Sequence, residues 1–218
     1  MEIAIHWQAR RYMAELTFRY GAMNCGKSDQ MISTAYNYTE NGLEVVTMMP
    51  EISMREPGFT TSRAGKKWKI DISTHLATPE GHIETDVYHE FHQRFGEKAV
   101  NCVLVDEVNF MSTAQVEALE KIAKVDDISV VAYGIRTNIQ RQLFEGTKRM
   151  FELADNSEKM PTMCPCGKQA EFNGRFVDGT FHVGEPVVWI DNDNRVKYQS
   201  LCGGCYLENA SMPGAIVA

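Results

Sequence analysis

Several features are absent or scarce in this sequence of 218 residues, and each absence excludes a class of protein. No stretch approaches the roughly 18 to 20 uninterrupted apolar residues that a membrane-spanning helix requires. The first residues lack the basic start and apolar run of a secretory signal, so we expect a cytoplasmic protein with no membrane partner. Lys and Arg number 22 against 29 Asp and Glu, and this acidic balance argues against a nucleic acid partner.

Internal repeats and low-complexity segments are also absent, and the composition excludes a disordered chain. It is 44% hydrophobic and 23% charged, which is typical of a folded protein. The length fits one main core with a small appendage. In a reducing compartment, the 6 cysteines are more typical of metal ligands or isolated thiols than of disulfides.

Strands and helices alternate along the first two thirds of the chain. The patterns predict strands at 13–20, 43–49, 100–105 and 128–133, and helices at 28–38, 87–95 and 112–123. This alternation predicts an α/β fold with a mostly parallel sheet flanked by helices. Residues 51–69, rich in Gly, Pro and basic side chains, are expected to form a mobile, solvated connection. From about residue 161, short runs and paired cysteines suggest a small second lobe.

The strongest motif is GAMNCGKS at residues 21–28, which matches G-x-x-x-x-G-K-[ST] between a predicted strand and a predicted helix. In such a loop, backbone N–H groups surround phosphate oxygens and the following helix presents its positive end to the same anion. We expect Lys27 to bridge the outer phosphates and Ser28 to bind Mg²⁺. The predicted nucleotide-binding residues are Gly21, Ala22, Met23, Asn24, Cys25, Gly26, Lys27 and Ser28.

Two acidic residues, Asp106 and Glu107, follow the apolar strand at 100–105. Side chains at the carboxyl end of a parallel strand face the crevice where such sheets bind ligands. We expect Asp106 to hold Mg²⁺ and Glu107 to accept a proton from an attacking hydroxyl.

Four cysteines form two tight pairs, Cys164 with Cys166 and Cys202 with Cys205. This pattern predicts a structural zinc site, with buried free thiols as the alternative. His182 is a substitute ligand if one of the first pair cannot reach the metal.

In this order, the motifs resemble the thymidine kinase family of the cytosolic type, which has a P-loop core and a zinc-binding lasso lobe. The resemblance rests on residues 18–28, 105–110, 133–138, 143–148, 166–170 and 198–206. It implies a RecA-like P-loop core at 14–157 and a lasso domain at 158–212, between an N-terminal extension at 1–13 and a tail at 213–218.

The resemblance also implies an activity and its ligands. The enzyme would transfer the γ-phosphoryl group of ATP to the 5′-hydroxyl of thymidine, and of deoxyuridine, in nucleotide salvage for DNA synthesis. Its cofactors would be ATP, Mg²⁺ and a structural Zn²⁺. It would form a homotetramer, with thymidine triphosphate as a feedback ligand.

Further site residues come from the resemblance alone. Arg55 would be an additional cation for the phosphates, and several residues would surround the nucleoside. These are Met23, Phe110, Ile135, Ile139, Phe144, Asn173, Tyr198 and, from a backbone segment at 188–192, Val188 and Ile190.

The chain departs from the family pattern at Ser53, Asn109, Asn138 and Ile139, and at Asp191-Asn192. None of these positions is Lys27, Ser28, Asp106 or Glu107, so we expect retained chemistry with altered substrate affinity. Two other functions stay open from the residues. One is a zinc-ribbon, nucleic-acid-stimulated ATPase, although a basic stripe and arrayed stacking aromatics are missing. The other is a nucleotide sensor without turnover.

Overall fold

The computed structural model describes residues 14–79, 81–185 and 195–216, and its centre is a six-stranded sheet. Every neighbouring pair in this sheet is parallel, which confirms the predicted fold class. The strand order is β5 (Ile72–Thr74), β2 (Glu44–Pro50), β6 (Val100–Val105), β7 (Ser129–Ile135), β1 (Leu16–Gly21) and β8 (Asn156–Lys159).

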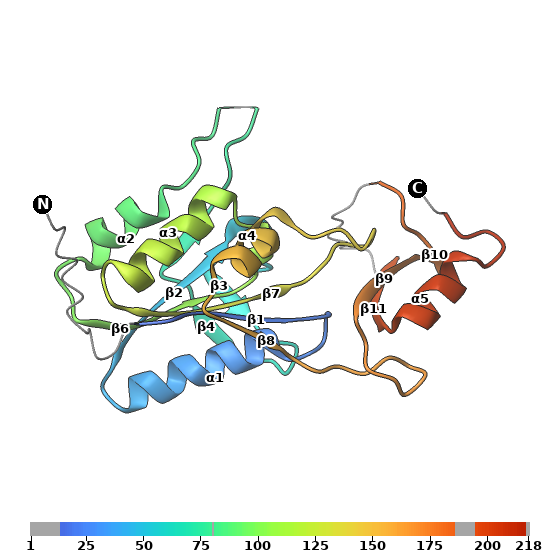
Figure 1. Cartoon of the computed structure of the whole chain (residues 1–218), viewed down its shortest axis with the longest axis horizontal. Coiled ribbons are helices and arrows are strands. Elements are labelled where there is room, and N and C mark those ends of the chain that lie inside the picture. The colour runs from blue at the N-terminus through green and yellow to red at the C-terminus, as the bar shows by residue number, and fades with distance from the viewer. Residues whose placement is uncertain (1–13, 80, 186–194, 217–218) are drawn as a thin grey trace, which may run out of the picture.

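Helices cover both faces of the sheet (Figure 1). One face carries α1 (Lys27–Glu40); the other carries α2 (Val87–Phe95), α3 (Thr113–Lys124) and α4 (Glu145–Leu153). Successive strand side chains point to opposite faces, so Val103 packs with the three helices and Leu104 packs with α1. Both faces of β6 are therefore buried, as its continuous apolar sequence predicts.

The local signals for these elements are confirmed at the start of α3 but place two boundaries differently from the structure. Ser112 and Gln115 form the predicted capping box at the start of α3. Strand β7 continues through Gly134, where the sequence suggested a stop, because Gly134 pairs with Tyr20 of β1. Strand β8 carries the main sheet to Lys159, two residues beyond the expected end of the core at 157.

The second lobe lies beyond one end of the main sheet (Figure 1). It contains an antiparallel sheet in the order β10 (Thr180–Phe181), β9 (Phe172–Val177) and β11 (Val196–Leu201), followed by α5 (Gly203–Ala210). Its small core packs Phe181, Leu201 and Tyr206 beside two of the cysteines. Ile216, in the expected tail, exchanges backbone hydrogen bonds with this lobe at Phe181 and Val183.

The segment expected to be a mobile connection has regular structure instead. It begins with the short helix η1 (Glu51–Ser53) and then forms a hairpin of β3 (Phe59–Thr61) and β4 (Lys67–Lys69). Trp68 of the hairpin makes an edge-on contact with Tyr36 of α1, with ring centroids 4.8 Å apart. The sequence does not predict this contact between the hairpin and α1, because the basic composition of the segment does not reveal which side chains have partners.

Among the helices of the described part of the chain, none is long and apolar enough to cross a bilayer. Residues 1–13, the expected N-terminal extension, lie outside the described residues.

Candidate active site

The phosphate loop connects β1 to α1 in a tight curve. Gly26 adopts the left-handed conformation (φ 81°, ψ 20°), which glycine reaches without strain. A side chain at Gly21 would have a Cβ only 2.6 Å from the Cys25 Sγ and 2.8 Å from the Met160 carbonyl oxygen. The two glycines therefore let the loop close on itself at the N-terminal end of α1, where a helix favours an anion.

Lys27 is buried, with 6% of its surface exposed, and its side chain turns back over this loop. Its Nζ lies 3.2 Å from the Ala22 carbonyl oxygen and 3.5 Å from the Cys25 Sγ. An ammonium group has three donors, so these contacts leave donor capacity for phosphate oxygens.

Two side chains of the second lobe hold the middle of the phosphate loop. The Met23 N–H donates to the Asn173 Oδ1 at 2.7 Å, and the Ser200 hydroxyl donates to the Met23 carbonyl oxygen. Asn173 and Ser200 are directly opposite one another on β9 and β11. The lobe thus binds both backbone polar groups of Met23, the N–H and the carbonyl oxygen. Asn173, which is expected beside the base and sugar, accepts a hydrogen bond from the loop backbone.

Asp106 follows β6 at the same edge of the sheet and is fully buried. Its Oδ2 accepts a 2.7 Å hydrogen bond from the Thr60 hydroxyl, and its Oδ1 accepts from the Glu107 N–H at 3.1 Å. A carboxylate offers about four acceptor positions, so these bonds leave lone pairs for a cation. The donor chemistry of Asp106 and Ser28 therefore fits Mg²⁺.

Glu107 has an unusual backbone and an unusual acidity. Its φ of 51° and ψ of 40° lie in the left-handed region, which is strained for a residue with a side chain. Loss of hydration and the negative charge of Asp106 raise the pKa of the Glu107 carboxyl to about 7. A carboxyl group with this pKa can accept and release a proton near neutral pH.

Cations lie near this carboxyl pair. Lys27 and Arg55 each act to lower the pKa of Glu107, which indicates that both positive charges are close to it. Burial, and then the positive charge of Arg55, lower the pKa of Arg63. Arg63 is exposed, in agreement with the solvated basic segment expected from the sequence, and it lies close to Arg55.

Some of the residues expected around a nucleoside contact one another. The rings of Phe110 and Phe144 meet edge to face, with centroids 5.4 Å apart. Ile139 is buried, and its carbonyl oxygen accepts a hydrogen bond from the Tyr206 hydroxyl of the second lobe. The Asn109 Oδ1 accepts from the Ile135 N–H at 3.0 Å and so ties η2 (Val108–Phe110) to the end of β7.

Two other expected nucleoside contacts are only partly described. Tyr198 is half-buried on β11, where it pairs with Arg175 of β9. Val188 and Ile190 lie outside the described residues.

The four paired cysteines come together in the second lobe, with all four Sγ atoms within 4.8 Å of one another. Zn–S bonds of about 2.3 Å in a tetrahedron place sulfur atoms about 3.8 Å apart, so this cluster could hold zinc. Burial opposes ionisation of Cys164, but backbone N–H groups of Cys166 and Cys202 lower its pKa to about 7. His182, the substitute ligand, is not in the cluster; its Nδ1 lies 2.7 Å from an Arg175 nitrogen.

Thr60 and Ser200 are the polar contacts that sequence reasoning missed. Each acts on a motif residue far along the chain, Thr60 on Asp106 and Ser200 on Met23. Neither has a motif of its own, so the single sequence offered no signal for these roles.

The fold and this site define a class: an α/β protein with a phosphate loop after β1, an acidic pair after β6 and a separate cysteine-bearing lobe. A family model described as thymidine kinase matches residues 14–206. The chain belongs to the thymidine kinase family, whose members are phosphoryl-transfer enzymes.

Named relatives agree with this assignment over most of their lengths. The thymidine kinase of Enterobacteria phage T4 is 36% identical, covering 77% of this chain and 84% of the relative. The thymidine kinase of Photorhabdus laumondii is 35% identical, covering 90% of this chain and 94% of the relative. That of Pasteurella multocida is 35% identical over 92% of this chain and all of its own length.

The contact between the lobe and the phosphate loop generates a first prediction. Ser200→Ala removes the hydroxyl that binds the Met23 carbonyl, so the loop should hold phosphates less well. We expect the Kd for ATP, measured by calorimetry, to rise about two- to tenfold, the range for one lost hydrogen bond.

The control is Ser157→Ala on the exposed strand β8, which should leave the Kd unchanged. Equal ATP affinity in Ser200→Ala and the parent protein would show that the lobe does not support the loop.

Proposed function

We propose that this protein transfers the γ-phosphoryl group of ATP to the 5′-hydroxyl of thymidine, and also of deoxyuridine. Membership of the thymidine kinase family is the observation that carries this proposal. The site supports it because Lys27, Asp106 and Glu107 lie together at the carboxyl edge of the parallel sheet. The family gives no support to the two alternatives, a nucleic-acid-stimulated ATPase or a sensor without turnover.

The chain's own residues divide the work as follows. The phosphate loop and Lys27 bind the triphosphate, and Arg55 adds positive charge near the transferred group. Ser28 and Asp106 would hold Mg²⁺, which supplies charge neutralisation to the β- and γ-phosphates. Glu107 accepts the proton of the 5′-hydroxyl as its oxygen bonds to the γ-phosphorus. The bond from that phosphorus to the β,γ-bridging oxygen then breaks, and ADP leaves.

Positioning contributes as much as charge to such a transfer, since the reaction requires the acceptor oxygen in line with the leaving oxygen. The nucleoside would be surrounded by the residues that the family resemblance assigns to it: Met23, Phe110, Ile135, Ile139, Phe144, Asn173, Val188, Ile190 and Tyr198. Asn173 would act partly through the Met23 backbone.

Three finer proposals accompany this function. The protein is a cytoplasmic homotetramer, thymidine and ATP are its substrates, and thymidine triphosphate is a feedback ligand. They rest on membership of the thymidine kinase family.

The activity is tested with a panel of nucleosides, ATP and Mg²⁺, scored for monophosphate product. We expect thymidine monophosphate, with deoxyuridine as a second substrate and no stimulation by single-stranded DNA. Tight binding of thymidine triphosphate with no product at any thymidine concentration would select the sensor instead, and DNA-stimulated ATP hydrolysis without thymidine would select the ATPase.

The proton acceptor is tested by Glu107→Gln, which keeps the shape of the side chain and removes its basicity. We expect ATP binding to persist and kcat to fall about 10²-fold or more. Only the ionised carboxylate of Glu107 accepts a proton, so turnover of the parent enzyme should fall as the pH drops below the pKa of this group, about 7. A Mg²⁺ ion bound nearby favours the ionised form and would lower the midpoint of this fall. The variant should lack this acid limb.

The matched control for that experiment is Glu208→Gln, an exposed residue on α5, which should keep both the rate and the pH profile. Near-normal turnover in Glu107→Gln would remove Glu107 as the base.

We also propose that Cys164, Cys166, Cys202 and Cys205 hold a structural zinc ion. Their clustered sulfur atoms support this, because four cysteine sulfur atoms at this spacing match the ligand set of a structural zinc site. We expect about one zinc per chain by elemental analysis, and loss of both zinc and thermal stability in Cys202→Ser.

Cys102→Ala removes a buried thiol from β6 and should retain the zinc. A zinc-free parent protein whose melting temperature does not change on adding zinc or chelator would contradict the assignment.

A further inference from the structure

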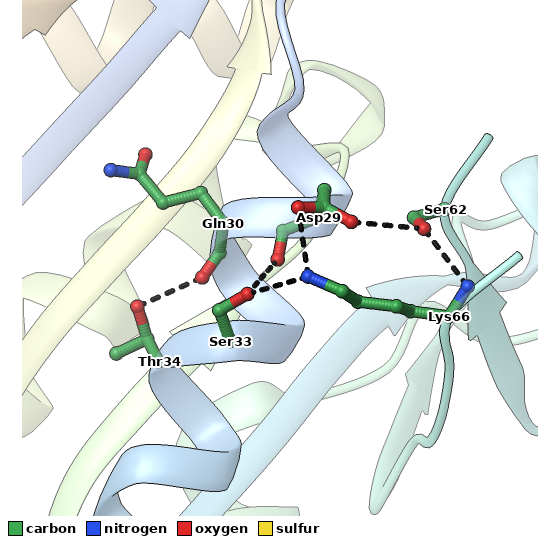
Figure 2. A network of polar contacts seen from close by, with 6 residues as sticks. All are labelled: Asp29, Gln30, Ser33, Thr34, Ser62 and Lys66. Atoms are coloured by element: carbon green, nitrogen blue, oxygen red, sulfur yellow. Dashed lines mark hydrogen bonds and ion pairs between the residues drawn. The ribbon is translucent and has the colours of Figure 1, made fainter. Parts of the chain in front are cut away.

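The β3–β4 hairpin is fastened to the first two turns of α1, directly after the phosphate loop (Figure 2). The Lys66 Nζ lies 3.0 Å from the Asp29 Oδ2 and 3.0 Å from the Ser33 Oγ. The Ser62 hydroxyl donates to the Asp29 Oδ1 at 3.3 Å. Asp29 is the residue after Ser28, so the hairpin attaches beside a predicted Mg²⁺ ligand.

The turn that carries Ser62 and Lys66 is closed by its own hydrogen bonds. The Ser62 N–H donates to the Lys66 carbonyl oxygen at 2.8 Å, and the Lys66 N–H donates to the Ser62 Oγ at 3.1 Å. Gly65, with φ at +85°, permits the reversal and donates to the Ser62 carbonyl oxygen. A closed turn transmits the position of Lys66 to the adjoining strand β3.

Strand β3 reaches the acidic pair at Thr60. This residue is two positions before Ser62, so in extended chain both side chains project to the same side. Thr60 is 1% exposed, and its hydroxyl donates the 2.7 Å hydrogen bond to the Asp106 Oδ2. The Glu107 N–H holds the other carboxylate oxygen, so two donors fix the plane of the Asp106 carboxylate.

We propose that Thr60 is a positioning residue for phosphoryl transfer, and that the contacts of Lys66 with Asp29 and Ser33 hold it in place. One chain of contacts thus joins the first turns of α1, directly after the phosphate loop, to the carboxylate that follows β6, a strand two positions from β1 in the sheet. The inference rests on the proposed role of Asp106 in holding Mg²⁺. Its new content is that β3 sets the orientation of that carboxylate.

Thr60→Val tests the hydroxyl, because valine keeps the shape of the side chain and cannot donate a hydrogen bond. The measurement is the Mg²⁺ concentration that gives half-maximal binding of a fluorescent ATP analogue, followed by kcat and KM for ATP. We expect the Mg²⁺ midpoint to rise about three- to tenfold in Thr60→Val, the cost of one buried hydrogen bond. Thr60→Ser, which restores the donor, should return close to the parent value.

Lys66→Met tests the attachment to α1, with Lys67→Met as its matched control. The two lysines are adjacent and have similar side-chain exposure, 46% and 42%, but Lys67 pairs with Glu56 and not with α1. Both variants lose one positive charge, so a general effect on attraction of ATP would appear in both. We expect the Mg²⁺ midpoint to rise about two- to fivefold in Lys66→Met alone, as for a partly exposed ion pair.

Asp106→Asn separates failure of this inference from failure of the proposed metal role. If it leaves the Mg²⁺ midpoint unchanged, Asp106 does not hold the metal and the proposed function of that residue fails. If it shifts the midpoint while a folded Thr60→Val does not, only the positioning role of Thr60 is overturned. Thermal unfolding shows whether each variant is folded. If Thr60→Val and Thr60→Ser both have a lower melting temperature but an unchanged Mg²⁺ midpoint, the role of Thr60 is purely structural.

Discussion

The parallel pairing of β6, β7 and β1 is the constraint on which the rest of the site depends. Gly21 at the end of β1 pairs with Ile135 at the end of β7, and Val105 at the end of β6 pairs with Ala132. The phosphate loop, the acidic pair and the segment after β7 therefore emerge at one edge. A strand running the other way would move its group to the opposite edge, about 20 Å away for six residues.

Strand pairing brings these groups together but does not orient them, and long-range side-chain bonds supply the orientation. Thr60 fixes Asp106, while Asn173 and Ser200 fix Met23. Such bonds are costly to leave unmade, because a buried acceptor without a donor loses its hydration and gains nothing. The strained backbone of Glu107 persists because the surrounding structure fixes its conformation. Burial beside Asp106 keeps the pKa of its carboxyl raised.

The sequence predicts whatever depends on neighbouring residues, and misses what depends on docking. Alternating polarity located β1, the continuous apolar run located β6, and Ser112 with Gln115 located the start of α3. The phosphate loop and the cysteine pairs also have fixed local spacing. By contrast, the sequence predicts a mobile connection at 51–69, because basic side chains suggest contact with solvent. The structure places Lys66 beside Asp29 and Ser33, and Lys67 beside Glu56, so that residues 59–69 form a docked hairpin. Thr60 has no signal other than that placement.

The register of the second lobe connects its fold to the phosphate loop. Asn173 and Ser200 form a cross-strand pair, so both can hydrogen-bond to Met23 only if β9 and β11 keep their observed register. A slip of one residue would turn the slipped strand's side chain to the other face of the small sheet. Cys202 follows β11 directly and begins α5, whose Tyr206 bonds to the Ile139 carbonyl oxygen. The cysteine cluster therefore lies at the end of β11, the strand whose register places Ser200 opposite Asn173. The shape of the phosphate loop thus depends on a lobe more than 140 residues further along the chain.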